Sequence, residues 1–308
     1  MKSKINNKNK YKNICCPRCK SDNVKKDGKR RTDYRGLIQR YKCKNCSYRL
    51  VQDDGFYRMR NNPQKITCSL DLFYGGLSTR EIQEHFKAFF PHNSNHSTIL
   101  RWIRKYSLQI ANFTDKLKVK TCSYIEVDEI EYHRRKSHKK KLGIDKNWFI
   151  DEIDVKTRFM INSKFVKHRS KTELKEVLSG IKNKSVNVRI VTTDGLTAYE
   201  NIVKKTWGYD NKAGEYKINH NVVTASKGQG FNIWIERLHN TIRQRTQNFR
   251  GLHGSLESAY ALFKGIQIYY NFVKKHDALR GKTPSELAIP NLKFKSSNRW
   301  LELIKMSN

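Results

Sequence analysis

Two pairs of cysteines near the N-terminus constrain the fold of this chain more than any other feature of its sequence. Each pair, Cys16–Cys19 and Cys43–Cys46, has two residues between its cysteines. Such a gap lets a tight turn present both thiolates to one tetrahedral ion, and two pairs complete a four-thiolate Zn²⁺ site. The intervening stretch has little apolar core, so metal binding must supply its folding free energy. We therefore predict a zinc ribbon with a basic N-terminal arm over residues 1–60.

The other three cysteines do not fit this site. Cys15 is adjacent to Cys16, but only Cys16 gives the two-residue gap, and Cys68 and Cys122 are isolated residues that we expect to be small buried hydrophobes. An odd total of seven cysteines, four of them paired, favours metal binding in a reducing compartment over a disulfide framework. With no apolar signal segment and no long apolar run, we expect a cytoplasmic, nucleoid-associated protein and no membrane partner.

The charge of the chain indicates its partner. Its 308 residues include 63 Lys and Arg against 28 Asp and Glu, a formal net charge of +35. Self-repulsion of this size opposes compaction unless a polyanion neutralises it, and cationic side chains gain free energy by releasing the counterions of nucleic acid. We therefore expect double-stranded DNA as the partner. A ribosome-associated or merely soluble basic protein, or one that binds an anionic membrane surface, are the alternatives.

Residues 61–118 have the pattern of a helix-turn-helix. Pro63 can open a helix that Gly75-Gly76 ends, and Ser78 with Glu81 has the form of a capping box for a short second helix. Ser97 can cap a third helix, which we expect to enter the major groove. The exposed residues that would then read DNA are His96, Ser97, Thr98, Arg101 and Lys105. An ordinary helical linker is the alternative.

From residue 119 to 290 the pattern alternates strands and helices. We expect strands over 124–132, 148–155 and 158–166, then a helix over 170–181 and a strand over 186–193. A helix over 196–207, a strand over 220–224, and helices from 232 and over 256–272 follow. This order predicts a mixed α+β fold of the α/β class, with a ribonuclease-H-like integrase core whose helices cover the sheet. Residues 291–308 are expected to form a tail.

Three acidic residues stand out in this segment. Asp128 lies in the first strand, Asp194 ends the fourth, and Glu236 lies early in the helix from 232. Because the first and fourth strands should be neighbours, we expect the three carboxylates to converge on two divalent ions, Mg²⁺ or in its place Mn²⁺. Asp128 would bridge both ions, and Asp194 and Glu236 would each hold one. Any single acid is more often a solvated side chain, so the prediction depends on the three together.

Basic and aromatic residues surround Glu236 on the same helix. His239 and Arg243 share its face at helical spacing, and they would either grip DNA phosphates or serve as ordinary ion-pair partners. Trp234 is as compatible with the protein core as with a platform that stacks on a frayed or flipped base.

At these residues the chain resembles the DDE-type transposases of prokaryotic insertion sequences, and in particular the insertion-sequence-six-like group. The resemblance covers Cys16 to Pro290. The matching pieces are Val127-Asp128-Glu129, Thr193-Asp194-Gly195 with Ala198-Tyr199, Glu236-Arg237-Leu238-His239, Arg243, Tyr270-Asn271-Phe272, His276, Leu279 and Gly281-Lys282-Thr283-Pro284. Two features depart from the group: a longer gap between Asp194 and Glu236, with a surface insertion over 212–219, and Ile233 after Asn232 where relatives often have paired asparagines.

The resemblance implies an enzyme that binds the terminal inverted repeats of an insertion sequence, cleaves one strand at each end and joins the freed 3′-hydroxyl to target DNA. Because two ends must be held together, it also implies a homodimer or higher oligomer. Two other functions remain open. One is a DNA-binding regulator with the zinc ribbon and helix-turn-helix but no catalysis. The other is a ribonuclease-H-like nuclease that cuts without joining.

Overall fold

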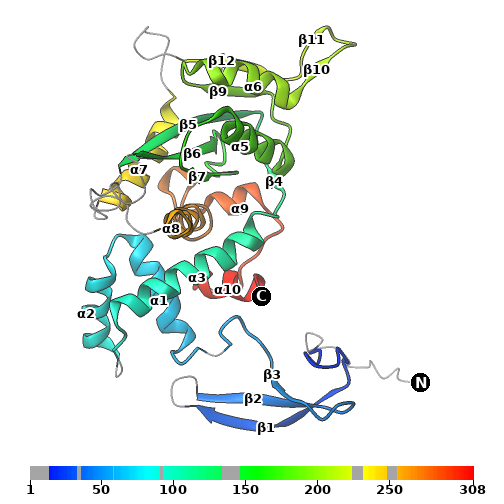
Figure 1. The fold of residues 1–308 in the computed structure, drawn as a ribbon, viewed down its shortest axis with the longest axis vertical. Helices are drawn as coiled ribbons and strands as arrows, with labels where there is room; N and C mark the ends of the chain where they lie inside the picture. Colours follow the sequence, from blue (N-terminus) through cyan, green and yellow to red (C-terminus); the bar gives the residue numbers. More distant parts are fainter. Residues whose placement is uncertain are drawn as a thin grey trace. The chain divides into compact units, whose positions relative to one another are not determined.

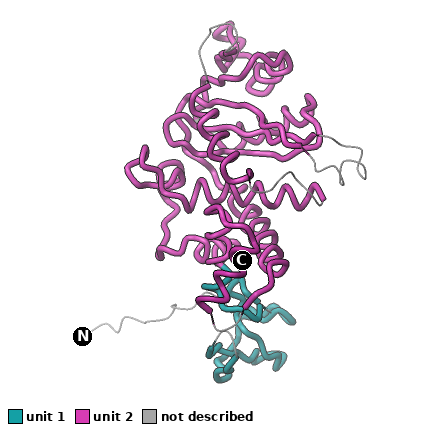
Figure 2. The backbone as a smooth tube through the Cα atoms, turned by 90° about the vertical axis from the view of Figure 1, so that its left-hand side faces the viewer, with its two compact units in different colours: residues 1–66, 308 teal, residues 67–307 magenta. Residues whose placement is uncertain are grey.

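The computed structural model describes residues 14–32, 36–57, 59–90, 93–133, 146–223, 232–247 and 255–308. The basic N-terminal arm expected before residue 14, and Thr224 at the end of the fifth expected strand, lie outside the described residues. The chain divides into two compact units, residues 1–66 with residue 308, and residues 67–307 (Figure 2). The expected integrase core and most of the expected helix-turn-helix therefore belong to one unit, whereas the cysteine pairs and residues 61–66 belong to the other.

The first unit is built on a three-stranded antiparallel sheet. Its strands are β1 (Val24–Thr32), β2 (Gly36–Cys43) and β3 (Arg49–Val51), in the order β1-β2-β3. The register of β1 and β2 shifts between Lys26 and Lys29, where Gly28 adopts a φ of +69° that favours glycine. The apolar core here is small and consists of side chains such as Tyr41, Leu50 and Phe56. This small core agrees with the expectation that a metal stabilises the segment.

Three helices follow, as expected for a helix-turn-helix. They are α1 (Pro63–Gly75), α2 (Thr79–Phe89) and α3 (His96–Thr114). The predicted capping box of α2 is present, because Ser78 accepts from Glu81 N and the Glu81 carboxylate accepts from Ser78 N. The prediction that Ser97 caps α3 is wrong. Asn95 is the N-cap, and its side-chain oxygen accepts a hydrogen bond of 2.9 Å from Ser97 N.

The second unit is organised around a five-stranded mixed sheet in the order β12-β9-β5-β6-β7 (Figure 1). Its strands are β5 (Tyr124–His133), β6 (Lys146–Asp154), β7 (Lys164–Val166), β9 (Ile190–Thr193) and β12 (Asn219–Val222). β5, β6 and β7 pair antiparallel, whereas β9 is parallel to β5 and β12. The first and fourth expected strands are therefore neighbours, in the order predicted for a ribonuclease-H-like sheet.

Two strands are shorter than predicted because the backbone turns. Of the expected strand over 158–166 only β7 forms, since Arg158 has a φ of +61° after the turn that Asp154 stabilises through Thr157 N. Of the strand over 186–193 only β9 joins the main sheet. Asn187, at a φ of +71°, separates β9 from β8 (Ser185–Val186), which pairs with β4 (Val119–Lys120) in a sheet of two strands.

Helices cover both faces of the main sheet. α5 (Lys171–Lys184) and α6 (Thr197–Trp207) pack together, and α7 (Ile233–Thr246) packs on β5 and β6. Between α6 and β12, the expected insertion contains the second strand of a small hairpin, β10 (Tyr209–Asp210) with β11 (Glu215–Tyr216). α8 (Leu256–Ile268) packs on β7 and on α3, and Phe263 contacts Phe149 and Phe165 of the sheet.

The chain ends in a series of short helices. α8 continues into the π-helical turn η3 (Tyr269–Val273), and η4 (Asp277–Leu279) and α9 (Pro284–Ala288) follow. The segment expected as a tail contains α10 (Arg299–Met306), which buries Trp300, Leu303 and Ile304 and packs against α3. Among the described residues, no helix is both long and apolar enough to span a membrane.

Candidate metal centres

The four predicted zinc ligands come together at one end of the first unit's sheet. Cys43 is the last residue of β2, Cys46 lies in the turn that follows it, and the other pair precedes β1. All four Sγ atoms lie within 4.8 Å of one another. The Cys16–Cys46 and Cys19–Cys43 Sγ pairs are each 3.5 Å apart. A tetrahedral Zn²⁺ with bonds of about 2.3 Å requires sulfur atoms about 3.8 Å apart, so the four side chains fit the ion.

The backbone favours the thiolate forms of Cys16 and Cys43, whereas the neighbouring thiols of Cys46, Cys43 and Cys16 help to raise the pKa of Cys19 to about 12. Burial raises the pKa of Cys16, but the backbone hydrogen bonds from Cys19 and Arg18 outweigh it and lower that pKa to about 7. Backbone hydrogen bonding at Cys46 and Asn45 likewise lowers the pKa of Cys43. Cys15 is directed elsewhere, because its thiol donates to Lys20 O at 2.8 Å. The sequence-based choice of Cys16 over Cys15 agrees with this arrangement.

A second cluster of metal-ligating groups lies where β5 and β9 run side by side. Asp128 is in the middle of β5, and Asp194 follows the last residue of β9. Oxygen atoms of Asp128, Asp194 and Glu129 lie within 4.8 Å of one another. Backbone amides hold two of the carboxylates, since Glu129 N donates to Asp128 Oδ1 at 2.8 Å and Leu196 N donates to Asp194 Oδ1 at 3.0 Å. The structure thus brings together two of the three predicted catalytic acids.

Electrostatics at this cluster favour a bound cation. Burial raises the pKa of Asp128 to about 6, and the neighbouring Asp151 and Asp194 add to the rise, whereas His239 opposes it. Burial also raises the pKa of Glu129 to about 7, again with help from Asp194 and Asp128. Carboxylates that resist ionisation because they are buried together are stabilised by a divalent ion. The hard oxygen donors fit Mg²⁺ or Mn²⁺.

Glu129 is the member of the cluster that sequence reasoning did not select. Its side chain is only 2% exposed, accepts a hydrogen bond of 2.9 Å from the Tyr199 hydroxyl and lies 3.9 Å from Arg169. Successive residues of a strand point to opposite faces of the sheet, so strand periodicity alone does not indicate that the carboxylates of Glu129 and Asp128 meet. The one available signal was that Glu129 directly follows Asp128 in the middle of β5.

Glu236 lies on α7 and is exposed, and it is not part of the acidic cluster found among the described residues. Its helix is nevertheless anchored beside that cluster. Glu126 of β5 is buried, and its Oε2 accepts hydrogen bonds of 2.9 Å from both Trp234 N and Ile235 N, in the first turn of α7. The role of Glu236 as third catalytic acid therefore remains a prediction.

His239 is an ion-pair partner in this structure. Its Nε2 donates to Asp151 Oδ1 at 2.7 Å, and its Nδ1 lies 3.6 Å from Asp128 Oδ2. A ring that is 2% exposed with both nitrogens facing carboxylates is not available to a DNA phosphate, so the prediction of DNA contact is corrected for this residue. Arg243, one turn further along α7, is exposed and keeps that prediction.

Trp234 lies between two guanidinium groups near the start of α7. Arg158 is centred 3.1 Å from the centroid of its ring and Arg237 lies 5.0 Å from it. The side chain is half-buried, and the choice between a core residue and a stacking platform stays open. In the structure it packs against cations.

The predicted DNA-reading residues follow one side of the first turns of α3. Ser97, Arg101 and Lys105 are exposed, and His96 and Thr98 are half-buried. Arg101 Nη2 donates to Thr98 Oγ1 at 3.0 Å. Residues on the opposite side of the helix are buried: Ile99, Trp102, Ile103 and Tyr106. The face that carries the predicted contacts is therefore left open by the packing of the helix.

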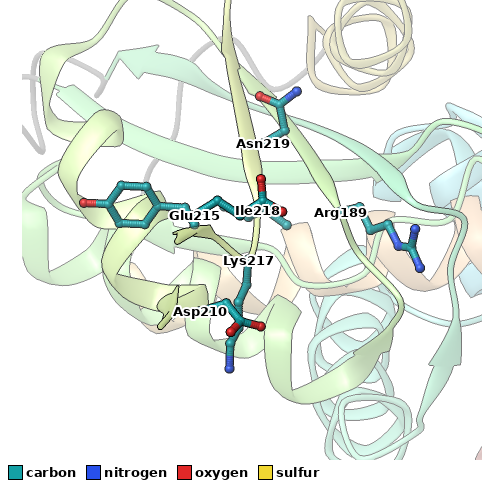
Figure 3. A pocket seen from close by; sticks show the side chains of 7 residues that line it. Arg189, Asp210, Glu215, Lys217, Ile218 and Asn219 are labelled. Carbon is teal, nitrogen blue, oxygen red and sulfur yellow. The ribbon is translucent and has the colours of Figure 1, made fainter. Parts of the chain in front are cut away.

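A surface pocket of about 720 Å³ lies at the β10–β11 hairpin (Figure 3). Its lining includes Asn219 and four residues that carry charges of both signs, Arg189, Asp210, Glu215 and Lys217. None of the three clustered acids lines it. We therefore place the candidate chemistry at the acidic cluster and not in this pocket.

No protein-family model matches the chain, and no curated protein matches it. Among solved structures, it is similar to the HTLV-2 integrase catalytic core domain in complex with magnesium, at 13% identity and a TM-score of 0.36, over 55% of this chain and 97% of that one. It is similar to the simian T-cell lymphotropic virus intasome in complex with PP2A regulatory subunit B56 gamma, at 10% identity and a TM-score of 0.37, over 72% of this chain and 73% of that one.

A third similar structure is the Drosophila P element transposase strand transfer complex, at 14% identity and a TM-score of 0.33, over 59% of this chain and 43% of that one. Similarities of this size assign neither a family nor an activity. The functional argument therefore depends on the residues of this chain.

Proposed function

We propose that this protein is a DNA transposase of the DDE type, which cleaves the ends of an insertion sequence and joins them to target DNA. One observation carries the proposal. The carboxylates of Asp128 and Asp194, from the adjacent strands β5 and β9, converge with Glu129 to within 4.8 Å. The sheet has the strand order expected of a ribonuclease-H-like core, and in such a sheet neighbouring parallel strands bring acids at equivalent positions side by side.

The residues of the chain would divide the work at this site. Asp128, between Asp194 and Glu129, would hold divalent cations from one side, and Asp194 would complete the site at the end of β9. Two such ions, when bound, would activate the attacking oxygen and stabilise the leaving one. The protein itself orients these carboxylates through backbone amides, as at Asp128 Oδ1 and Asp194 Oδ1.

The third acid has two candidates. Glu236, proposed from the sequence, lies on α7, whose first turn is anchored to β5 by Glu126. Glu129 already lies in the cluster and is held by Tyr199. We keep Glu236 as the third catalytic acid and propose that Glu129 lines the site without binding the metal. If the reverse holds, Glu129→Gln will abolish joining and Glu236→Gln will not.

DNA binding is proposed for surfaces outside the acidic cluster. On α3 the residues are His96, Ser97, Thr98, Arg101 and Lys105, and on α7 the residue is Arg243. The zinc ribbon, with Zn²⁺ held by its four cysteines, would add backbone-phosphate contacts through its basic strands. Recognition of terminal inverted repeats, membership of the insertion-sequence-six-like group, a nucleoid location and assembly as a homodimer or higher oligomer belong to the same proposal.

A strand-transfer assay tests this function. Labelled duplexes from the DNA on either side of the coding sequence serve as candidate ends, and a supercoiled plasmid serves as the target, with Mg²⁺ or Mn²⁺. We expect joined products from the wild-type protein and a loss of roughly 100-fold or more in Asp194→Asn. Glu257→Gln, a change of an exposed acid on α8, is the matched control and should join ends normally.

The alternatives give different outcomes in the same assay. Metal-dependent nicks without joined product would identify a nuclease that cuts without joining. Specific binding to the end DNA with neither nicks nor joined product would identify a regulator. Joining that is unaffected by Asp194→Asn would contradict the site itself.

A further inference from the structure

A buried histidine links the candidate catalytic acid Asp128 to a second acid that has no assigned role. Asp128 and Asp151 are directly paired across β5 and β6, and paired residues of neighbouring strands project from the same face of a sheet. α7 packs on these two strands and directs His239 between the two carboxylates. The distances are 2.7 Å from Nε2 to Asp151 Oδ1 and 3.6 Å from Nδ1 to Asp128 Oδ2.

The side chains of His239 and Asp151 are both enclosed by the surrounding protein. His239 is 2% exposed and Asp151 is fully buried. Within the described part of the chain, Asp151 Oδ2 has no hydrogen-bond partner. Burying a carboxylate with one oxygen unsatisfied costs free energy, and replacing such buried pairs by apolar residues often stabilises a protein. The stability of the fold therefore does not by itself explain why His239 and Asp151 are buried next to Asp128.

The hydrogen bond to Asp151 fixes the orientation of the histidine ring. Because an ionised carboxylate only accepts, each ring nitrogen that faces one carries a proton, and the ring plane is set with Nε2 bonded to Asp151 Oδ1 and Nδ1 directed at Asp128 Oδ2. The other oxygen of Asp128 accepts from Glu129 N. Both oxygens of Asp128 therefore have a defined neighbour, and the carboxylate cannot rotate freely.

We propose that Asp151 and His239 are a positioning pair that holds the Asp128 carboxylate in the orientation needed to bind a divalent cation. His239 is the residue that contacts Asp128, and Asp151 acts through His239. This inference rests on the proposed function, since it assigns a support to the same metal site.

The test uses two substitutions of His239, each of which keeps a nitrogen at the position of only one of the two ring nitrogens. The amide nitrogen of glutamine superposes on Nε2, and that of asparagine superposes on Nδ1. His239→Gln therefore keeps the contact with Asp151 and loses the one with Asp128, whereas His239→Asn does the reverse. The measurement is the Kd for Mn²⁺, from electron paramagnetic resonance of the full-length protein without DNA, with near-ultraviolet circular dichroism to verify the fold.

We expect Mn²⁺ binding to be about 10–100-fold weaker in His239→Gln, as for other residues that support metal ligands, and closer to wild type in His239→Asn. Asp151→Ala should weaken binding by a similar factor. Adding Asp151→Ala to His239→Gln should cause little further loss, because the two residues act through one contact.

Thr246→Val is the matched control. Thr246 lies on α7 and its hydroxyl is 3.2 Å from that of Tyr132 on β5, so this change removes a side-chain contact between the same two elements without touching an acid. It should lower the unfolding midpoint and leave the Kd for Mn²⁺ unchanged.

Four results separate the possible failures. A folded His239→Gln variant with wild-type Mn²⁺ affinity would overturn the positioning role, as would a loss confined to His239→Asn. A Thr246→Val variant that weakened Mn²⁺ binding as much as His239→Gln would also overturn it, because general loosening of α7 would then account for the effect. If Asp194→Asn does not weaken Mn²⁺ binding either, the proposed metal site is wrong, whatever His239 does.

Discussion

At the scale of single residues, the cysteines of the first unit differ in whether their thiols are placed to bind a metal. Cys16, Cys19, Cys43 and Cys46 have their sulfur atoms within 4.8 Å of one another, whereas the thiol of Cys15 is hydrogen-bonded to Lys20 O. Adjacent residues in the sequence therefore have different roles. Because the apolar core of this unit is small, a metal held by these four thiolates would be the main source of its folding free energy.

This difference leads to a prediction about Cys43→Ser and Cys15→Ser. Cys43→Ser should lose bound zinc and the strand signal of the first unit, because three thiolates leave the ion incompletely ligated. Cys15→Ser should retain one zinc per chain. Zinc content by mass spectrometry, with proteolysis to monitor folding, checks both. Normal zinc content and protease resistance in Cys43→Ser would rule out the structural site.

Histidine burial predicts a pH dependence of stability. Burial lowers the pKa of His276 and that of His220 below the usual 6.5. Between the folded and the unfolded pKa the unfolded chain binds more protons, so these groups stabilise the fold above pH 6.5 and this stability is lost as the pH falls below it.

These two histidines should therefore lower the free energy of unfolding as the pH falls from 7 toward 5, whereas the raised pKa values of Asp128 and Glu129 act in the opposite direction. His276→Asn should shift the slope of the free energy of unfolding against pH toward less positive values. His133→Asn, at a side chain that is 73% exposed, is the control and should leave the slope unchanged. Urea unfolding curves at several pH values measure it. An identical slope in His276→Asn and wild type would show that His276 does not contribute.

At the scale of elements, close packing between helices depends on one glycine. A Cβ added at Gly265 of α8 would overlap the Tyr74 hydroxyl of α1 and approach the Ser107 hydroxyl of α3. These two hydroxyls are hydrogen-bonded to each other at 2.8 Å in the interior. Glycine at this position lets α8 approach both helices, and this contact helps to join the helix-turn-helix segment to the core.

Gly265→Ala should therefore destabilise the protein by about 1–3 kcal/mol through overpacking, although alanine is the better helix former. Gly75→Ala is the matched control, because Gly75 is also helical and nothing lies within 4 Å of an added Cβ. It should be neutral or slightly stabilising. Chemical unfolding of both variants measures the difference, and equal stabilities would contradict the packing argument.

The elements themselves were predicted well where local signals were strong. The capping box of Ser78 and Glu81, the helix opened by Pro63 and the order of the strands from β5 to β12 all agree with the sequence. The two strands predicted over 158–166 and 186–193 are shorter in the structure, and Arg158 and Asn187 within them adopt positive φ. Neither residue is a glycine. Local hydrogen bonds to Asp154 hold the turn before Arg158, and composition gave no signal of either break.

At the scale of the whole molecule, the net charge of +35 dominates the expected interactions. Binding to duplex DNA should weaken steeply with salt, since each neutralised phosphate releases condensed counterions. Arg101 and Lys105, exposed on α3, lie on the face proposed to read the major groove.

Arg101→Ala should cost about 1–3 kcal/mol in binding to the element ends and reduce discrimination against unrelated DNA. Lys175→Ala on α5 removes one exposed positive charge outside the proposed face, and it should lower binding to both DNAs equally or not at all. Fluorescence anisotropy at several salt concentrations measures both. Equal losses on specific and unrelated DNA in Arg101→Ala would assign Arg101 to phosphate contact alone.

The sequence alone determined the features that depend on neighbours along the chain. The four cysteines, the helix caps and the alternation of strands and helices are of this kind, because two-residue gaps, capping boxes and periodic burial act over a few residues. Tertiary structure decided which groups meet. Glu129 joined Asp128 and Asp194, and His239 met Asp151, because the register of β5 with β6 and β9 and the docking of α7 place atoms from distant segments together. The contact of His239 with Asp151, 88 residues apart, has no signature in any short stretch of sequence.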